Sequence, residues 1–384
     1  MSAPVHRPKG VVMVIAGYHP YIGGAEGQAR SLAGELQRRG IPVWIATRAR
    51  PGLPSDELVD HIPVHRLAAF GPGPVAAFVF MASVFLHLWN RQDDYDVIHV
   101  HLASAHAVAA AWAAKLFKKR IVIKLAGGKG FGEVTTSQRT FLGRMKLKEL
   151  GDLKPQLAAP NPDILKELKG TPLEHLPAAV IPNGVDLRKY KPAEPEEKAA
   201  LRKALGWNER FALLSASRLD DDKGVSGLLF EFITVWAATE HEGVRLYIAG
   251  TGPREEALKK HAQEAKARVT FLGARHDVER LFKAADAFLL PSRSEGMSNA
   301  LLEAMACGLP VLATKVSGIQ ELVQHEVDGL LYSPGDFEGL HETLDHLILD
   351  PGEAQKLGKA AREKVQAYSL EKTADQWLQL YTMT

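Results

Sequence analysis

The chain alternates short apolar strands with helices along its length, and this alternation constrains the fold more than any other feature. Residues 11–16, 43–47, 97–101 and 121–125 each form an apolar run of strand length, with helical patterns between them. Strands that alternate with helices build parallel sheets through right-handed crossovers. The sequence therefore predicts an α/β architecture with parallel sheets.

A break in this pattern divides the chain into two parts. Turn residues, prolines and charges cluster at residues 183–186 and 191–195, and the alternation restarts with a strand expected over residues 211–215. A chain of 384 residues also exceeds what one hydrophobic core usually organises. We therefore predict two similar Rossmann-like domains with a cleft between them, an N-terminal one over residues 1–190 and a C-terminal one over residues 191–367.

Composition indicates an ordinary soluble protein. The hydrophobic fraction of 46% and the charged fraction of 24% are typical of globular domains. Cys307 is the only cysteine, which excludes an intramolecular disulfide and fits a reducing compartment. The apolar run after the charged N-terminal residues is too short for a signal peptide, so we expect a cytoplasmic protein.

Charge and hydropathy raise the question of a membrane surface. Residues 1–180 hold 22 lysines and arginines against 14 acids, an excess that favours an anionic surface or acceptor, with chance unevenness as the alternative. Residues 74–90 carry no formal charge but are fewer than the ~20 needed to span a bilayer. We predict a buried helix there. The alternative is a helix that dips into the inner membrane face or faces a lipid acceptor.

Two glutamates stand eight positions apart near the C-terminus. Glu295 follows the apolar run 287–291, so it lies in a loop at the carboxyl end of a strand, where open α/β sheets bind ligands. Glu303 falls in the first turns of the next helix, whose free N–H groups favour an anion. Such a site suits a ligand that is anionic at one end and rich in hydroxyls elsewhere, as a nucleotide-sugar is.

Two further motifs follow strands in the same way. Arg218 and Lys223 flank a tight loop after the strand at 211–215, where a guanidinium and an ammonium can both reach a diphosphate. Gly23 and Gly24 stand at the turn after the first strand and permit close backbone approach to a ligand. A surface charge cluster and a plain tight turn are the alternatives when each motif is taken alone.

The sequence gives little indication of a metal site. Asp220 and Asp222 match the Asp-x-Asp pattern of metal-dependent transferases, but they stand between Arg218 and Lys223. His99 and His101 share one face of a predicted strand without an evident third ligand, so we interpret them as core or cleft-lining residues.

Together these motifs resemble the family four glycosyltransferases, which are retaining enzymes of the GT-B fold. The resemblance covers most of the chain, and the glutamate pair matches the family's two-glutamate signature. It implies that residues 368–384 cross back onto the N-terminal domain. Four other segments also carry the resemblance: residues 97–101, 181–186, 248–253 and 271–273.

The resemblance implies roles for individual residues. Arg218 and Lys223 would hold the donor diphosphate, Glu295 would lie near the donor sugar, and Glu303 would accept hydrogen bonds from the ribose. With two cations on the diphosphate, neither a metal nor another cofactor is expected. The remaining donor-binding residues would be Gly23 and Gly24 from the opposite domain, Gly250 and Gly273 beside the base, and Gly296, Met297, Ser298, Asn299 and Ala300 near the phosphates or sugar.

One position departs from the family pattern. Many relatives carry a histidine just after the strand equivalent to residues 121–125, and Ala126 stands there in this chain. The sugar contact on this side would therefore come from backbone groups or from Lys129, or be absent.

The resemblance implies transfer of a hexose-type sugar, with retention, from a nucleoside-diphosphate sugar to a hydroxyl acceptor. We expect UDP rather than GDP, and a glycan or lipid-linked acceptor in cell-envelope or polysaccharide synthesis. Because Glu303 would be engaged with ribose, no carboxylate pair remains for double displacement, which favours a front-face route.

Other functions fit the sequence less well. The alternatives are an epimerase or a phosphorylase on the same fold and a non-catalytic nucleotide-sugar-binding protein. A nicotinamide-dependent dehydrogenase is disfavoured because Gly-x-Gly-x-x-Gly is missing between a first strand and helix. Nucleic acid is not an expected partner, since the basic residues form no dense clusters with interleaved aromatics.

Overall fold

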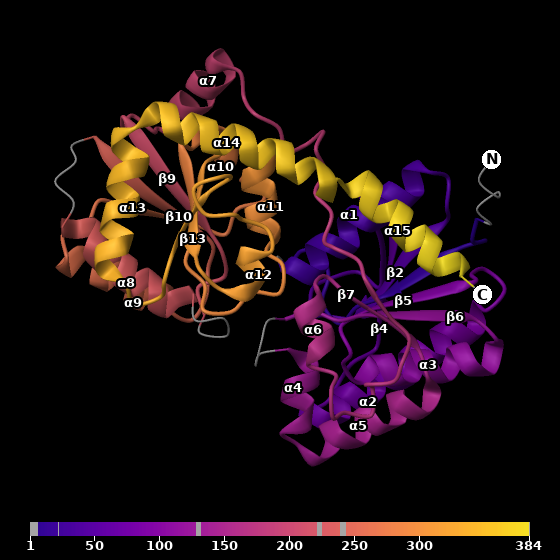
Figure 1. Cartoon of the computed structure of the whole chain (residues 1–384). Coiled ribbons are helices and arrows are strands. Elements are labelled where there is room, and N and C mark those ends of the chain that lie inside the picture. Colours follow the sequence, from indigo (N-terminus) through magenta and orange to yellow (C-terminus); the bar gives the residue numbers. More distant parts are fainter. Residues whose placement is uncertain (1–6, 22, 128–131, 221–224, 239–242, 384) are drawn as a thin grey trace. The chain divides into compact units, whose positions relative to one another are not determined.

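The computed structural model describes residues 7–21, 23–127, 132–220, 225–238 and 243–383 (Figure 1). The chain divides into two compact units, each with its own sheet. Unit 1 comprises Met1–Gly184 and Leu370–Thr384, and unit 2 comprises Val185–Ser369.

In the described part of unit 1, eight strands form one sheet in the order β3-β4-β2-β1-β5-β6-β7-β8. Neighbouring strands pair in parallel, as the alternation predicts, except that β3 and β4 form an antiparallel hairpin at one edge. The strands are β1 (Val11–Val14), β2 (Val43–Arg48), β3 (Asp56–Val59), β4 (Ile62–Leu67), β5 (Val97–His101), β6 (Arg120–Lys124), β7 (Gln156–Ala159) and β8 (Ala178–Val180).

Both faces of this sheet are covered by helices, because successive side chains of a strand point to opposite faces. In β1, Val11 and Met13 enter the core beneath α1 (Gly24–Arg38) and α15 (Leu370–Thr382). The alternate residues of β1 enter the core beneath α2 (Gly73–Asn90), α3 (Ala105–Phe117) and α5 (Phe141–Leu153). Shorter helices α4 (Glu133–Gln138) and α6 (Pro162–Lys166) complete the unit.

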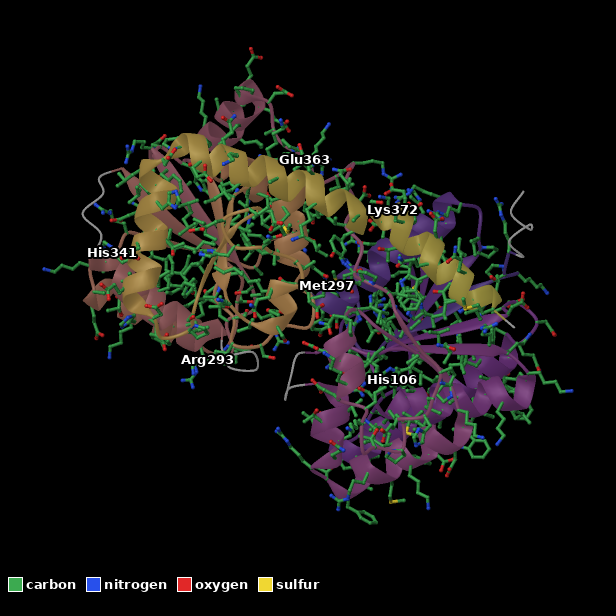
Figure 2. All side chains as sticks on the ribbon, viewed as in Figure 1. His106, Arg293, Met297, His341, Glu363 and Lys372 are labelled. Atoms are coloured by element: carbon green, nitrogen blue, oxygen red, sulfur yellow. The ribbon has the colours of Figure 1, made fainter. Side chains whose placement is uncertain are left out.

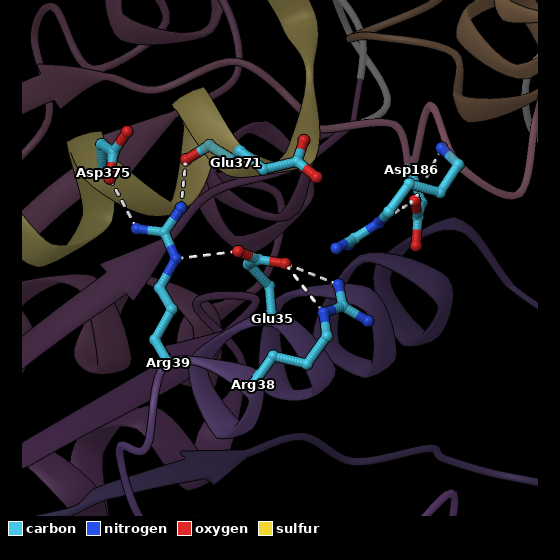
Figure 3. A network of polar contacts seen from close by, with 7 residues as sticks. Glu35, Arg38, Arg39, Asp186, Glu371 and Asp375 are labelled. Atoms are coloured by element: carbon cyan, nitrogen blue, oxygen red, sulfur yellow. Dashed lines mark hydrogen bonds and ion pairs between the residues drawn. The ribbon is translucent and has the colours of Figure 1, made fainter.

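The last helix, α15, belongs to unit 1, so the predicted return of the C-terminus is confirmed. It buries Trp377, Leu380 and Tyr381 in the core that α1 shares. A polar network at the end of α1 joins the two helices (Figure 3).

Arg39 is the centre of this network. Its Nε donates to Glu35 Oε1 at 2.8 Å, its Nη1 pairs with Asp375 Oδ1 at 2.5 Å, and its Nη2 donates to the Glu371 carbonyl at 2.8 Å. Arg38 Nη2 donates to the other oxygen of Glu35 at 2.6 Å. Glu35 is only 4% exposed, and the guanidinium groups of Arg38 and Arg39 compensate the charge of this buried carboxylate.

In the described part of unit 2, six parallel strands form one sheet in the order β11-β10-β9-β12-β13-β14. The strands are β9 (Phe211–Ala216), β10 (Val244–Ala249), β11 (Val269–Gly273), β12 (Ala287–Leu290), β13 (Val311–Thr314) and β14 (Leu330–Tyr332). One face packs against α7 (Pro195–Leu205), α10 (Val278–Ala284), α11 (Asn299–Ala306), α12 (Ser317–Gln320) and part of α14 (Pro351–Val365). The other packs against α8 (Val225–Ala238), α9 (Glu255–Glu264), α13 (Phe337–Leu349) and the start of α14.

The prediction of a buried helix at residues 74–90 is wrong. In α2 only Phe80, Val84 and Leu88 are buried, and these form the ridge that packs onto the sheet. Phe78 is 71% exposed and Leu86 is 55% exposed. Among the described residues, α2 is the one helix long and apolar enough to cross a membrane by length and composition, with 17% of it buried.

We predict that Glu35→Ala loosens α15. Without the carboxylate, Arg39 loses its most buried acidic partner, and the loss of such a charged hydrogen bond costs about 1–3 kcal/mol. Hydrogen exchange followed by mass spectrometry should show faster exchange of residues 370–382 and unchanged exchange in unit 2.

The matched control is Asp375→Ala, which removes a carboxylate whose side chain is 61% exposed from the same guanidinium. An exposed pair contributes at most about 1 kcal/mol, so exchange of α15 should change little. Equal exchange in Glu35→Ala and the wild type would contradict the assignment.

Candidate functional site

The predicted donor residues of unit 2 lie at one edge of its sheet. Arg218 follows β9, Gly250 follows β10, and Gly273 ends β11. Glu295 lies in the segment between β12 and α11. Because all these strands are parallel, their carboxyl ends meet at the same edge. Lys223, the second predicted cation, lies outside the described residues.

Backbone hydrogen bonds hold the first loops of this edge together. Gly250 N donates to the Gly273 carbonyl at 2.8 Å, and Ser217 N donates to the Ala249 carbonyl at 3.0 Å. Gly250 has φ +135°, and a Cβ there would lie 1.8 Å from the Ser217 carbonyl oxygen. Only glycine therefore permits this approach of the two loops.

The side chain of Glu295 is fixed by polar groups at the ends of β12 and β13 that the sequence did not indicate. Ser292 Oγ donates to Glu295 Oε1 at 2.9 Å, and Ser292 N donates to Thr314 Oγ1 at 3.1 Å. A Cβ on Gly318 would lie 2.1 Å from the Glu295 carbonyl oxygen, so this glycine lets α12 approach the loop. Serine and threonine at two neighbouring strand ends are the only signal that could have found this support.

The start of α11 carries the other predicted donor-binding residues. Ser298 caps the helix, since its side chain accepts from Leu301 N at 3.3 Å. Met297 and the buried Gly296 precede the cap (Figure 2). Asn299 and Ala300 form the first turn, whose N–H groups have no intrahelical acceptor and favour an anion.

Glu303 lies one turn further along α11, where it is partly buried. It forms a hydrogen bond with Tyr190, and both Lys189 and Glu279 are close enough to affect its charge. Lys189 Nζ is 3.4 Å from Glu279 Oε2. Burial raises the pKa of Glu303 to about 7, against a smaller lowering by the Tyr190 hydrogen bond. Tyr190 was not among the predicted site residues.

Arg218 projects from the edge of unit 2. Its side chain is 65% exposed, and its Nη2 pairs with Asp220 Oδ2 at 2.5 Å. A diphosphate that binds Arg218 would compete with this carboxylate. Asp222 lies outside the described residues, and among those described no group of three histidines, cysteines or acids could hold a metal ion.

In unit 1, Gly23 and Gly24 lie at the start of α1, as the sequence indicates. A Cβ on Gly23 would lie 2.1 Å from Glu26 Oε2, and one on Gly17 would lie 3.0 Å from Glu26 Oε1. Gly17 and Gly23 therefore leave room for the Glu26 carboxylate, which lies against the turn.

At Ala126, where many relatives have a histidine, the backbone amide binds the carboxylate of Glu133. Ala126 N donates to Glu133 Oε1 at 3.0 Å, and Ala103 N approaches the same oxygen at 3.4 Å. Burial raises the pKa of Glu133, and these backbone donors oppose that rise. Lys129 lies outside the described residues.

The two histidines of β5 are core residues. His99 and His101 are 0% and 1% exposed, and their rings stack with centroids 4.4 Å apart. His99 Nδ1 is 2.6 Å from the Tyr381 hydroxyl of α15. Burial lowers the pKa of both histidines well below the ordinary range, so they are neutral at physiological pH.

Comparison with known proteins identifies this architecture. The family "Glycosyl transferases group 1" matches residues 197–364, and "Glycosyltransferase Family 4" matches residues 22–189. The structure of Anabaena HepE in complex with UDP and glucose is similar, with a TM-score of 0.78, 22% identity, and coverage of 96% of this chain and 98% of that one. The class is thus a glycosyltransferase of the GT-B fold.

Sequence relatives define the family. An Escherichia coli UDP-Gal:alpha-D-GlcNAc-diphosphoundecaprenol alpha-1,3-galactosyltransferase is 30% identical over 78% of both chains. A Corynebacterium glutamicum GDP-mannose-dependent monoacylated alpha-(1-6)-phosphatidylinositol monomannoside mannosyltransferase is 28% identical over 93% of both chains. This chain belongs to the family 4 glycosyltransferases, as its motifs predict.

We predict that Gly250→Ala disrupts the edge of unit 2. The added methyl group collides with the Ser217 backbone and the φ is strained, so nucleoside-diphosphate affinity should fall at least tenfold in calorimetric titration. The matched control is Gly206→Ala at the end of α7, which has φ +71° but no atom within 4 Å of the added Cβ. Its affinity should remain that of the wild type, and an equal loss in both variants would contradict the assignment.

The pKa of Glu303 predicts a pH-dependent stability. Since its folded pKa is about 7 and its ordinary value is 4.5, the folded state binds the proton more tightly than the unfolded state. The associated stability is present below about pH 4.5 and is lost as pH rises through 7, by about 2–3 kcal/mol. Urea unfolding of unit 2 at pH 5 and pH 8 should show this loss in the wild type and a smaller one in Glu303→Gln. Identical pH slopes in the two proteins would show that Glu303 does not titrate as stated.

Proposed function

We propose that the chain transfers a hexose-type sugar from a nucleoside-diphosphate sugar to a hydroxyl acceptor, with retention at the anomeric carbon. The observation that carries the proposal is the single sheet edge in unit 2. Arg218, Glu295, Glu303 and the start of α11 all stand at the carboxyl ends of its parallel strands. That set provides a cation for phosphate, the N-terminus of a helix for an anion, and carboxylates for hydroxyl groups.

The donor is a UDP-sugar in this proposal, and a GDP-sugar is the alternative. Among the relatives, the galactosyltransferase is named for UDP-Gal and the mannosyltransferase for GDP-mannose. In either case Glu303 would accept hydrogen bonds from the ribose. It does so best when ionised, so nucleotide affinity should rise as pH passes about 7.

Charge on the leaving diphosphate decides the chemistry. The departing group gains negative charge in the transition state, so Arg218 and Lys223 would lower the barrier as well as bind the donor. Glu295, with one oxygen fixed by Ser292, would orient the donor sugar rather than form a covalent adduct. The leaving phosphate would then assist removal of the acceptor's proton on the same face of the sugar.

A glycan or a lipid-linked acceptor at an anionic membrane surface is part of this proposal. The helical layer of α2, α3 and α5 exposes large apolar side chains, with lysines and arginines among them. Apolar side chains with flanking cations are the combination that anionic lipid surfaces bind. We call this set the apolar layer: Val75, Phe78, Leu86, Trp89, Trp112, Leu116, Phe141, Leu142 and Met145, with Lys115, Lys118, Arg144 and Lys148.

The donor test is a thermal-shift screen of nucleoside diphosphates and their sugars. A ligand at a hundred times its Kd stabilises the fold by ~2.7 kcal/mol, which identifies the base. Arg218→Ala and Glu295→Gln should then lower kcat by about 10²–10³ with the matching donor, while Arg293→Ala, an exposed neighbour paired with Glu231, should not. Turnover of the donor without an acceptor, or only with free phosphate, would instead indicate an epimerase or a phosphorylase.

The membrane test is sedimentation with phosphatidylglycerol vesicles. Phe78→Ser should weaken binding roughly tenfold or more, because burial of a phenylalanine contributes about 1.5–3 kcal/mol. High salt should weaken it further by screening the cations. The control is Leu58→Ser on β3, because Leu58 is 69% exposed and lies outside the apolar layer. Binding that is unaffected by both changes, or no binding, would remove the membrane from the proposal.

A further inference from the structure

The loops that follow β5 and β6 in unit 1 are bound by one carboxylate. Glu133, the first residue of α4, accepts from Ala126 N at 3.0 Å and from Ala103 N at 3.4 Å, and it uses the same oxygen, Oε1, for both. Because β5 and β6 are parallel neighbours, the two loops leave the same edge of the sheet. Glu133 therefore fixes the distance between two loops at the edge where open α/β sheets bind ligands.

A second charged side chain binds the loop after β5. Lys146 Nζ of α5 donates to the Ala103 carbonyl at 2.6 Å. Both backbone groups of Ala103 are thus engaged by side chains that follow it by 30 and 43 residues in the chain. Long-range polar contacts, rather than local turn chemistry, determine the conformation of this loop.

The backbone of the same loop is strained. Leu102, the first residue after β5, has φ +71°, a left-handed conformation that is unfavourable for a bulky side chain. Among the described residues other than glycine that have a positive φ, Leu102 is the one with an apolar side chain, and the others lie in turns or directly after helices. Such strain persists only where surrounding contacts enforce it, and it is concentrated at active sites.

The loop after β6 carries the position at which the chain departs from its family. Ala126 stands where many relatives have a histidine that contacts the donor sugar, and a methyl group cannot make that polar contact. The Ala126 amide is already bound by Glu133, so it is not a spare donor for the sugar. A fixed backbone therefore occupies the position where relatives present a side chain.

We propose that Glu133 is a positioning residue for sugar transfer, because it fixes the strained loop after β5 and the backbone at Ala126 through two amide hydrogen bonds. It acts through these loops and does not touch the reacting atoms. Reacting groups must be aligned closely, and a displacement of about 1 Å can lower the rate about 10²-fold. The role in transfer rests on the proposed function, whereas the contacts of Glu133 with the two loops do not.

A purely structural role is the competing explanation. Glu133 stands in the first turn of α4, where a carboxylate stabilises a helix through its dipole. In that case the loss of Glu133 would lower thermal stability and leave the kcat of the folded protein unchanged. A positioning role instead predicts a loss of kcat that a side chain with the same hydrogen-bonding oxygen restores.

The first experiment measures hydrogen exchange of the full chain by mass spectrometry in the presence of UDP. Glu133→Ala removes the acceptor of both amides, so residues 102–104 and 125–127 should exchange faster. Glu133→Gln keeps a carbonyl oxygen at the same reach, so its exchange should stay close to that of the wild type. Unchanged exchange at both loops in Glu133→Ala would overturn the proposal.

The matched control is Glu167→Ala. Glu167 Oε2 accepts from Thr135 Oγ1 of α4 at 2.7 Å, so this change removes a carboxylate from the same helix without reaching either loop. Exchange at residues 102–104 and 125–127 should equal that of the wild type. Faster exchange there in the control would show that loosening α4 is sufficient, which would also overturn the specific role of Glu133.

The second experiment measures nucleoside-diphosphate release from UDP-glucose, UDP-galactose and GDP-mannose. With the donor that the wild type turns over, Glu133→Ala should lower kcat about 10²-fold while the donor KM changes little. Glu133→Gln should restore most of kcat, and Glu167→Ala should retain it. Calorimetric UDP affinity should be equal in all variants, because the expected diphosphate site lies in unit 2. A lower thermal stability with an unchanged kcat would leave Glu133 only a structural role.

Failure of this proposal and failure of the proposed function give different results. If Arg218→Ala and Glu295→Gln lower kcat but Glu133→Ala does not, the positioning role is overturned and the proposed function stands. If Glu133→Ala alone lowers kcat, the donor site proposed in unit 2 is wrong and the positioning role stands. If the wild type turns over none of the three donors, exchange at the two loops decides: faster exchange in Glu133→Ala alone supports the role, and equal exchange in all variants overturns it.

Discussion

Parallel strands buried on both faces govern the layout of this protein. The central strands satisfy their backbone groups through their neighbours and are mostly apolar on both sides, because helices cover both faces of the sheet. Polar chemistry is therefore confined to the strand ends and the loops that follow them. In unit 2 that edge carries Arg218, Glu295 and the start of α11. In unit 1 the corresponding edge carries Gly23, Arg48 and Arg66.

The two edges differ in how far their charges are compensated by the protein. In unit 2, Arg218 pairs with Asp220, and Glu295 accepts a hydrogen bond from Ser292. In unit 1, Arg48 and the Tyr18 hydroxyl lack any such partner among the described residues.

The sequence predicted those features that depend on local order. Neighbouring residues in the chain determine the strand and helix periods and the break before the second sheet. They also determine where Glu295 and Glu303 stand relative to a strand end. The exposure of α2 could not be predicted, because a helix that is apolar on every side does not show which side faces the core. Tyr190 beside Glu303, and Glu133 on the Ala126 amide, are contacts between distant segments that periodicity does not encode.

The return of α15 to unit 1 has a consequence for biosynthesis. Trp377 and Tyr381 fill a core that also contains Val11 and Met13 of β1, which are translated more than three hundred residues earlier. Unit 2 is continuous, so it can fold on the ribosome while unit 1 still waits for its last helix. The side of this core that α15 covers is therefore completed only when synthesis ends. It also means that a fragment ending at Gly184 would lack part of its own interior, whereas unit 2 is one continuous segment, Val185–Ser369.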